Sequence, residues 1–180
     1  MILVTVGMHT QPFDRLVAAA DELAALVDEQ VVIQCGAATY LPRFAQHVDF
    51  VPGDRMQTWL SDSRIVVSHA GAGSILDALC ASKPLVLAPR LKCFDEHIDD
   101  HQLELAETLD EQERAVMLTK LSAETLAEAI VQAERLAGEE VLNETSLQSA
   151  LRNWLAEQAE RSPPSRWGLF RKNTGSERIL

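Results

Sequence analysis

The sequence has no long apolar run and little cysteine. None of the apolar stretches in its 180 residues approaches the roughly 18 to 20 residues that a transmembrane helix needs. Residues 1–6 pass directly into a strand pattern, without the charged segment and cleavage site of a secretion signal. Three cysteines, Cys35, Cys80 and Cys93, are too widely spaced to suggest a disulfide framework or a zinc site. We therefore expect a cytosolic protein with reduced cysteines.

Basic side chains are also scarce. There are 16 lysines and arginines against 27 aspartates and glutamates, which gives a formal net charge of −11. Because nucleic-acid backbones are bound by basic stripes, this balance argues against nucleic acid as a general partner. With 47% apolar residues, the chain can hold one sizeable core and is too short for two full α/β domains.

The end of the chain differs in charge from the rest. Residues 161–180 hold five basic side chains and one acidic side chain, whereas residues 1–160 carry a formal charge of −15. The final segment contains a Pro-Pro pair and lacks periodicity, so we predict one domain at 1–160 and a basic, mobile tail at 161–180. Trp167 and Phe170 among its arginines suit a membrane interface or a groove on a partner. A tail without a role is the alternative.

Several ligand-binding signatures are missing. The first strand is not followed by G-x-G-x-x-G, which argues against a dinucleotide-dependent dehydrogenase, and no Gly-Lys-Ser/Thr marks a P-loop. There is no Asp-x-Asp pair for a metal-bound nucleotide. Glu96, His97, Asp100 and His101 are titratable, but they lie too close in sequence to converge on one ion. We therefore predict neither a metal nor a cofactor.

What the sequence does contain is a buried strand that runs into a turn of small residues, at residues 64–75. Ile65 to Val67 form a short β-branched run typical of a parallel strand. Gly71 and Gly73 allow a tight bend and a close approach to a ligand, and Ser74 is the expected cap of a helix that begins near Ile75. A helix N-terminus offers free N–H groups and a partial positive charge, so this turn favours a phosphate or another anion. The alternative is an ordinary strand-to-helix turn that needs glycine for steric reasons.

Short apolar strands alternate with segments of helical period along the chain, a pattern that indicates an α/β fold. We predict a Rossmann-like parallel sheet with helices on both faces. The expected strands are residues 2–6, 31–36, 48–51, 65–67, 85–88 and 115–118. The expected helices are residues 13–27, 56–60, 75–81, 102–109, 125–136 and 139–160, with a short helical turn at 40–46.

Other candidate site residues stand at strand ends, where open parallel sheets bind ligands. Gly7 ends the first strand and is either a close approach to phosphate or a plain strand terminator. His9 is suited to phosphate binding, to proton transfer or simply to solvent exposure. Gln34 and Gly36 stand at the end of the second strand, where base or ribose contact competes with an ordinary turn. Asp77 is placed to accept hydrogen bonds from ribose hydroxyls, or it is an acid that favours the helix start.

Three blocks in order carry a family resemblance. They are His69-Ala-Gly-Ala-Gly-Ser-Ile-Leu-Asp77, Lys83-Pro-Leu-Val-Leu-Ala-Pro-Arg90 and Glu96-His-Ile-Asp-Asp-His-Gln-Leu-Glu-Leu-Ala106. Together they resemble the donor-nucleotide signature in the C-terminal half of GT-B glycosyltransferases (family 28 C-terminal-like). Within that group the chain is most similar to the small catalytic subunits of split transferases. These include the soluble subunit of the dolichol-linked N-acetylglucosaminyl transferase and bacterial exopolysaccharide glucuronosyl- or galactosyltransferase subunits.

The resemblance implies a set of nucleotide-sugar contacts. The diphosphate is expected at the backbone of Gly7 and at the turn after the fourth strand, the ribose at Asp77, and the sugar at Asp99 and Gln102. The family more often has glutamate where this chain has Asp77, and the shorter side chain must approach closely or act through water. The turn residues in this set are His69, Ala70, Gly71, Ala72, Gly73 and Ser74.

The resemblance also implies an inverting, metal-independent reaction in which only the donor half is present. A membrane-anchored subunit that carries the acceptor site is then expected as partner, with a UDP-sugar donor and a lipid-linked glycan acceptor at the cytoplasmic face of the membrane. Candidates for the catalytic base are His9 and Glu96, and the missing subunit is the other source. A nucleotide-sugar-binding regulatory subunit without activity is the alternative function.

Overall fold

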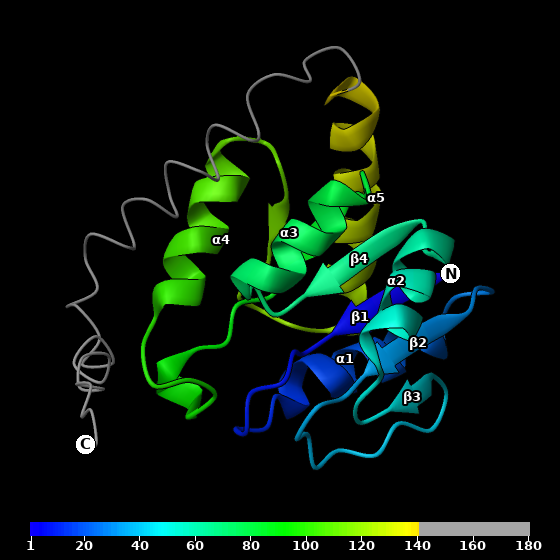
Figure 1. Ribbon diagram of the computed structural model, residues 1–180, viewed down its shortest axis with the longest axis vertical. Helices are drawn as coiled ribbons and strands as arrows, with labels where there is room; N and C mark the ends of the chain where they lie inside the picture. Colours follow the sequence, from blue (N-terminus) through cyan, green and yellow to red (C-terminus); the bar gives the residue numbers. More distant parts are fainter. Residues whose placement is uncertain (141–180) are drawn as a thin grey trace, which may run out of the picture. The chain divides into compact units, whose positions relative to one another are not determined.

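Six parallel strands form one sheet in residues 1–140, the part of the chain that the computed structural model describes (Figure 1). Their order across the sheet is β3-β2-β1-β4-β5-β6. The first three strands are therefore added from β1 at the centre to one edge, and the last three from β4, beside β1, to the other edge. The strands are β1 (Ile2–Thr5), β2 (Val31–Gln34), β3 (Gln46–Val48), β4 (Ile65–Ser68), β5 (Leu85–Leu87) and β6 (Val116–Met117). This arrangement confirms the predicted Rossmann-like α/β class.

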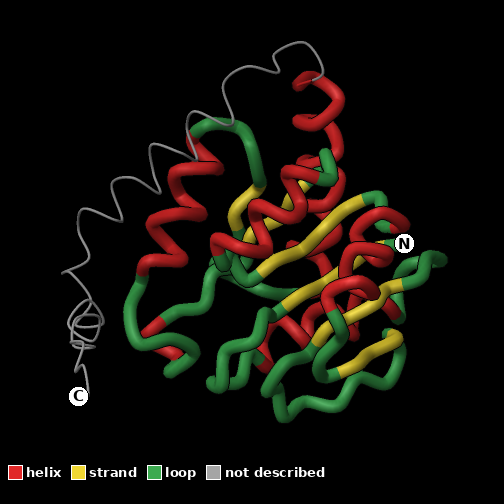
Figure 2. Tube along the Cα trace, in the orientation of Figure 1, coloured by secondary structure: helices red, strands yellow, loops and turns green. Residues whose placement is uncertain are grey.

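Helices connect the strands, except between β2 and β3, and cover both faces of the sheet, as Figure 2 shows by colour. Because the strands are parallel, each crossover must carry the chain back across a face. The helices are α1 (Asp14–Ala24), α2 (Gly53–Asp62), α3 (Ala72–Cys80), α4 (His101–Glu111) and α5 (Ala123–Glu140), with one 3₁₀ turn, η1 (Lys92–Phe94).

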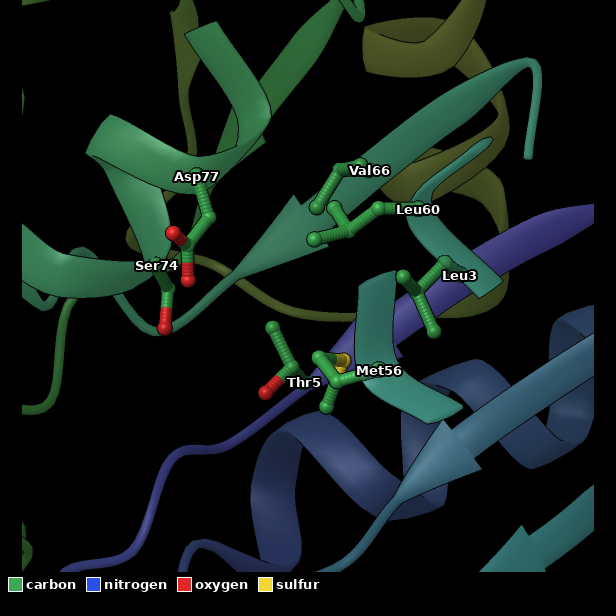
Figure 3. Close-up of a pocket in the computed structure, with 7 residues that line it drawn as sticks. All are labelled: Leu3, Thr5, Met56, Leu60, Val66, Ser74 and Asp77. Carbon is green, nitrogen blue, oxygen red and sulfur yellow. The ribbon is translucent and has the colours of Figure 1, made fainter. Parts of the chain in front are cut away.

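The alternation of side chains along β1 assigns the two layers. Ile2 and Val4 belong to a core shared with α1 and α5, where Leu16 and Leu126 are fully buried. Leu3 lies on the opposite face, in a layer covered by α2 and α3 (Figures 1 and 3). Since successive strand residues point to opposite faces, a strand that is apolar throughout must be covered on both sides.

Several element boundaries differ from the prediction. β3 begins at Gln46, two residues before the expected strand, and α3 begins at Ala72 rather than near Ile75. The helical turn expected at 40–46 is wrong, because this segment contains no helix and already enters β3. All but the first two residues of the helix expected at 139–160 lie outside the described residues. The basic tail expected at 161–180 lies wholly outside them.

The segment before β3 is fixed by acids of α1. Asp21 is fully buried, and its carboxylate accepts hydrogen bonds from the backbone N–H groups of Arg43, Phe44 and Ala45 at 2.8–2.9 Å and from the Tyr40 hydroxyl at 3.1 Å. Burial alone would raise the pKa of Asp21, but these hydrogen bonds outweigh it and the pKa is lowered. An ionised carboxylate therefore replaces the helical hydrogen bonds that the local sequence suggested.

No helix among residues 1–140 combines the length and apolarity that a membrane span requires. The three cysteines are free, with Cys35 buried and Cys80 and Cys93 exposed. Burial raises the pKa of the Cys35 thiol to about 11, so it is inert as a nucleophile.

Candidate functional site

Loops that follow β1, β4 and β5 meet at the C-terminal edge of the sheet. These strands are neighbours in the register, since Thr5 pairs with Ser68 and Ser68 with Leu87. Gly7 and His9 follow β1, and the His69–Gly71 turn follows β4. The loop from Arg90 to Asp99 follows β5. The fold thus brings together three of the segments that the sequence singled out.

His69 is packed between two glycines. A Cβ on Gly7 would lie 2.5 Å from Cε1 and Nε2 of its imidazole, and a Cβ on Gly71 would lie 2.9 Å from Cε1 and closer still to Nε2. Gly7 also has a φ of +76°, which favours glycine independently. A Cβ on Gly73, in contrast, would meet no atom within 4 Å outside the backbone of its own helix. The steric explanation of the turn therefore applies to Gly71, whose neighbour is the imidazole.

The turn enters α3 without a side-chain cap. Gly71 is the N-cap in an extended conformation, and the residue before it, Ala70, has a φ of +63°, a conformation that is uncommon for a residue with a side chain. Ser74 is therefore not the cap that the sequence suggested, because it is the third residue of the helix. The first N–H groups of α3 have no acceptor within the helix and point out of its N-terminus, as at any helix start.

His69 is buried, with 8% of its surface exposed, and its Nδ1 lies 3.4 Å from the Thr5 carbonyl oxygen. Burial, together with the positive charge of Arg90, lowers the pKa of His69 to about 4. The imidazole is therefore neutral near pH 7. In the unbound protein it shapes the turn sterically and brings no positive charge to it.

Asp77 and Ser74 of α3 line a small pocket against the sheet (Figure 3). The pocket has a volume of about 30 Å³. In Figure 3 the Asp77 carboxylate and the Ser74 hydroxyl lie side by side at the α3 wall, with Thr5 opposite them. The remaining lining residues are apolar, namely Leu3, Met56, Leu60 and Val66. The pocket beside the N-terminal turns of α3 is thus lined by polar side chains of α3 and β1 and by apolar side chains of α2 and the sheet.

Arg90 is completely buried and joins two of the loops. Its Nη2 donates a hydrogen bond to the Val6 carbonyl oxygen at 2.8 Å, and its Nη1 donates to the carbonyl oxygens of Gln11 at 2.8 Å and Glu96 at 3.1 Å. The guanidinium also lies 5.0 Å from the centre of the Phe13 ring. Sequence reasoning did not assign Arg90 a role, although an arginine three residues after a buried strand is an available signal.

Glu96, a candidate base, is engaged in structural contacts. It is 4% exposed, and its two carboxylate oxygens each accept a 2.7 Å hydrogen bond from Arg15. One of these oxygens also accepts from the backbone N–H of Leu91 at 3.0 Å. Both carboxylate oxygens are thus already engaged in hydrogen bonds within the protein, so this geometry disfavours Glu96 as the acceptor of a proton from a substrate hydroxyl.

His9 contacts His97, a residue that the sequence had raised only as a metal ligand. The two ring centroids are 4.9 Å apart and the planes are tilted by 40°. The backbone N–H of Gln11 donates to Nδ1 of His9 at 3.2 Å. Burial, then the nearby charges of His97 and Arg90, lower the pKa of His9. Two loops are therefore in contact through a pair of imidazoles.

Asp99 orients the imidazoles on its own loop. Its Oδ1 lies 2.9 Å from Nδ1 of His97 and 3.0 Å from Nδ1 of His101. Burial alone would raise the pKa of Asp99, but the hydrogen bonds and charge of His101 outweigh it and the pKa is lowered. Gln102, the other predicted sugar contact, accepts a hydrogen bond from the Arg90 backbone at 3.2 Å through Oε1.

Gln34 has a structural role in this edge of the sheet. It is buried, and it accepts a 2.7 Å hydrogen bond from the Thr5 hydroxyl while its Nε2 donates to the carbonyl oxygens of Gly7 and Asp49 at 3.0 and 2.9 Å. These bonds satisfy the amide within the protein, which favours the plain turn over base or ribose contact. Within residues 1–140, no three His, Cys, Asp or Glu side chains are grouped to hold a metal ion.

Comparison with known proteins relates this geometry to one family. Residues 1–166 match the glycosyltransferase family 28 C-terminal domain. The UDP-N-acetylglucosamine transferase subunit ALG13 of Eremothecium gossypii is 33% identical over 128 residues, which cover 64% of this chain and 61% of that protein. The human protein of the same name is 32% identical over 119 residues, covering 60% of this chain and 10% of that protein.

Solved structures show the same fold. The glycotransferase of kitacinnamycin superposes with a TM-score of 0.58 at 25% identity, covering 89% of this chain and 42% of that chain. The calicheamicin glycosyltransferase CalG4 gives a TM-score of 0.56 at 20% identity, covering 90% of this chain and 44% of that chain. The chain therefore spans about three-fifths of its fungal relative and less than half of these enzymes. On the match over residues 1–166, the chain belongs to the glycosyltransferase family 28 C-terminal domain family.

Proposed function

We propose that this chain is the donor-binding catalytic subunit of an inverting, metal-independent glycosyltransferase that uses a UDP-sugar. The observation that carries this proposal is the turn from His69 to Ser74. It opens the N-terminus of α3 at the C-terminal edge of the sheet, with the Asp77 pocket beside it. Free N–H groups at a helix start bind an anion without a metal ion.

In this proposal the backbone of Gly7 and of residues 70–74 holds the diphosphate, and Asp77 accepts hydrogen bonds from the ribose. Asp99 and Gln102 contact the sugar. His69 contributes by shaping the turn, because it is neutral and fills the space between Gly7 and Gly71. The helix N-terminus then stabilises the charge that develops on the departing nucleoside diphosphate.

The reaction also needs a base for the acceptor hydroxyl. His9 accepts a hydrogen bond from Gln11 through Nδ1, so a neutral His9 carries its proton on Nε2 and acts there as a hydrogen-bond donor. Glu96 is occupied by Arg15. Both arrangements favour a base on the partner subunit. His9 then donates a hydrogen bond from Nε2 to the bound UDP-sugar.

The acceptor half is the second part of the proposal. The solved enzymes are more than twice as long as their matched part, and the curated relatives are named as subunits. We infer a membrane-anchored partner that presents a lipid-linked acceptor at the cytoplasmic face, in exopolysaccharide or glycan synthesis. UDP-N-acetylglucosamine is the first donor to test, because the relatives are named for its transfer.

Calorimetry tests the donor site with the purified chain. We expect binding of UDP and UDP-N-acetylglucosamine that is unchanged by a chelator, and weaker or no binding of NAD. Binding that disappears in the chelator would contradict metal independence, and preference for NAD would overturn the donor assignment.

A transfer assay tests the split enzyme. Purified chain is added to membranes from source cells that lack it, which retain the partner and the acceptor, and labelled UDP-N-acetylglucosamine and other UDP-sugars are supplied in turn. Activity should require both chain and membranes. Full activity from the chain alone would refute the split. A non-catalytic subunit is indicated if membranes transfer sugar without the chain and the chain only changes the rate.

A further inference from the structure

Three histidines stand on three different loops beside the α3 turn, and we name His9, His69 and His97 the imidazole cluster. His9 and His97 are in ring contact at 4.9 Å between centroids. His69 interacts electrostatically with both of them. Each loop leaves a neighbouring strand, so the cluster exists only because β1, β4 and β5 lie next to one another in the sheet.

Among residues 1–140, the groups that set the charge around the cluster are Arg90 and Asp99, with His101 and Glu96 nearby. Arg90 is buried and acts on both His9 and His69, and its guanidinium contacts backbone carbonyl oxygens. Its Nε is buried without a hydrogen-bond partner among the described residues. Asp99 faces His97 and also acts on His9, while His101 shares its carboxylate. The carboxylate of Glu96 is turned to Arg15.

We propose that the imidazole cluster takes up a proton when a nucleoside diphosphate binds at the turn, so that nucleotide binding is linked to proton uptake. This inference rests on the proposed function, because it requires the diphosphate at the N-terminus of α3. In the unbound site, burial disfavours the charged form of His9 and of His69, and the charges of His97 and Arg90 add to this effect. A bound diphosphate brings negative charge to the same place and reverses the sign of the local field, which favours imidazolium.

His97 is the best placed of the three to receive the proton. Oδ1 and the carbonyl oxygen of Asp99 lie 2.9 and 3.2 Å from its Nδ1, against one backbone N–H at 3.4 Å. Two close oxygens favour the proton on Nδ1, which leaves Nε2 with the lone pair. Nε2 is therefore the nitrogen at which a second proton can add, while the Asp99 carboxylate is held against Nδ1.

The linkage has a consequence for the reaction. In the transfer, the acceptor oxygen bonds to the sugar C1 atom, the bond from C1 to the diphosphate oxygen breaks with its electron pair on that oxygen, and the hydroxyl proton passes to the base. The product UDP has one more ionisable oxygen than the UDP-sugar. The imidazole cluster should therefore take up more protons with UDP than with the UDP-sugar, which stabilises the leaving group.

Calorimetry of the full chain in pairs of buffers with different ionisation enthalpies measures proton uptake. UDP-N-acetylglucosamine and UDP are the probes. UDP is also titrated at pH 8, because its terminal phosphate has a second ionisation near pH 6 and is fully charged at that pH. The variants are His97→Gln and His9→Gln. His47→Gln is the matched control, since His47 is an exposed residue of the edge strand β3.

We expect roughly 0.5 to 1 proton to be taken up per UDP at pH 8, and less per UDP-sugar. For each linked proton, the affinity for the UDP-sugar should rise by up to about tenfold per pH unit as the pH falls from 8 to 6. Uptake should fall in His97→Gln or His9→Gln and persist in His47→Gln. Nucleotide binding without proton uptake, or uptake that both variants retain, overturns this inference alone. Absence of UDP and UDP-sugar binding at every pH overturns the proposed function and this inference with it.

Discussion

The imidazole of His69 occupies the space where Gly71 would carry a side chain. A Cβ at Gly71 would lie 2.9 Å from Cε1 of His69 and closer to Nε2. The φ of Gly71 is −73°, which any residue adopts, so its backbone conformation does not require glycine. The glycine is needed because of the histidine two residues earlier.

Gly71→Ala should therefore destabilise the protein by about 1–3 kcal/mol, the usual cost of forcing an extra methyl group into a packed site. Gly73→Ala is the control, because a Cβ there meets no atom within 4 Å outside the backbone of its own helix, and alanine favours the helix by up to about 1 kcal/mol. Urea unfolding measures both. The double variant His69→Ala with Gly71→Ala should recover part of the loss. Equal stability of Gly71→Ala and Gly73→Ala would contradict the steric explanation.

Much of the fold was predictable because it depends on local patterns. The apolar strands and the helical period between them indicate a parallel α/β sheet, and each predicted strand within residues 1–140 has a counterpart there. The segment before β3 was predicted wrongly, because its hydrogen bonds go to Asp21, about 20 residues away in sequence. Such long-range contacts leave no local pattern.

The site was predictable in outline only. Motif spacing indicated the turn at 69–74 and the acid at Asp77, and the fold brings the loops with His9 and Asp99 to the same edge of the sheet. The neutral state of His69, the burial of Arg90 and the contact between His9 and His97 depend on tertiary packing. A sequence shows which titratable residues are present but not how burial shifts their pKa values.

Asp77→Ala should weaken UDP binding by about 0.5–1.5 kcal/mol, the value of one hydrogen bond to ribose. Asp77 lines the pocket with Ser74, whereas Asp54→Ala, the control, removes an acid from the first turn of α2. Calorimetry compares the two variants with the unchanged chain. If both variants bind UDP equally well, Asp77 has no ribose contact.

Stability should fall with acidification because of His69. The pKa of this residue is lowered from 6.5 to about 4 in the folded protein, so between these values the unfolded chain binds a proton that the native protein does not. The contribution is fully present above pH 6.5 and is lost as pH falls toward 4, by at most about 1.4 kcal/mol per pH unit. Urea unfolding from pH 4.5 to 7.5 should show a shallower dependence for His69→Asn. The same slope in both proteins would mean that His69 is not held neutral.

Asp21→Ala should cost about 2–4 kcal/mol, because it strands three backbone N–H groups and the Tyr40 hydroxyl. Glu22→Ala, at the exposed neighbouring position of α1, should stay within about 0.5 kcal/mol of the unchanged protein. Thermal and urea unfolding provide the comparison. A loss of less than about 1 kcal/mol for Asp21→Ala would show that residues 40–45 hold their conformation without this carboxylate.

Arg90→Lys tests whether the buried guanidinium holds the loop after β1. Arg90 reaches the carbonyl oxygens of Val6 and Gln11 at 2.8 Å through two different nitrogens, and a lysine ammonium cannot occupy both positions. At least one buried carbonyl then loses its donor, at a cost of about 1–3 kcal/mol. The loop carrying Gly7 and His9 should open more often, so hydrogen exchange at residues 7–12 should accelerate and UDP should bind more weakly.

Arg55→Lys is the control for this substitution, because Arg55 is exposed on α2 and its guanidinium lies 5.2 Å from the Trp59 ring centre. It should leave stability, exchange and UDP affinity unchanged. Faster exchange across the whole chain in Arg90→Lys would indicate global destabilisation, whereas acceleration confined to residues 7–12 indicates a loop that has lost its anchor. Unchanged exchange at residues 7–12 would mean that the carbonyl contacts of Arg90 do not position the loop.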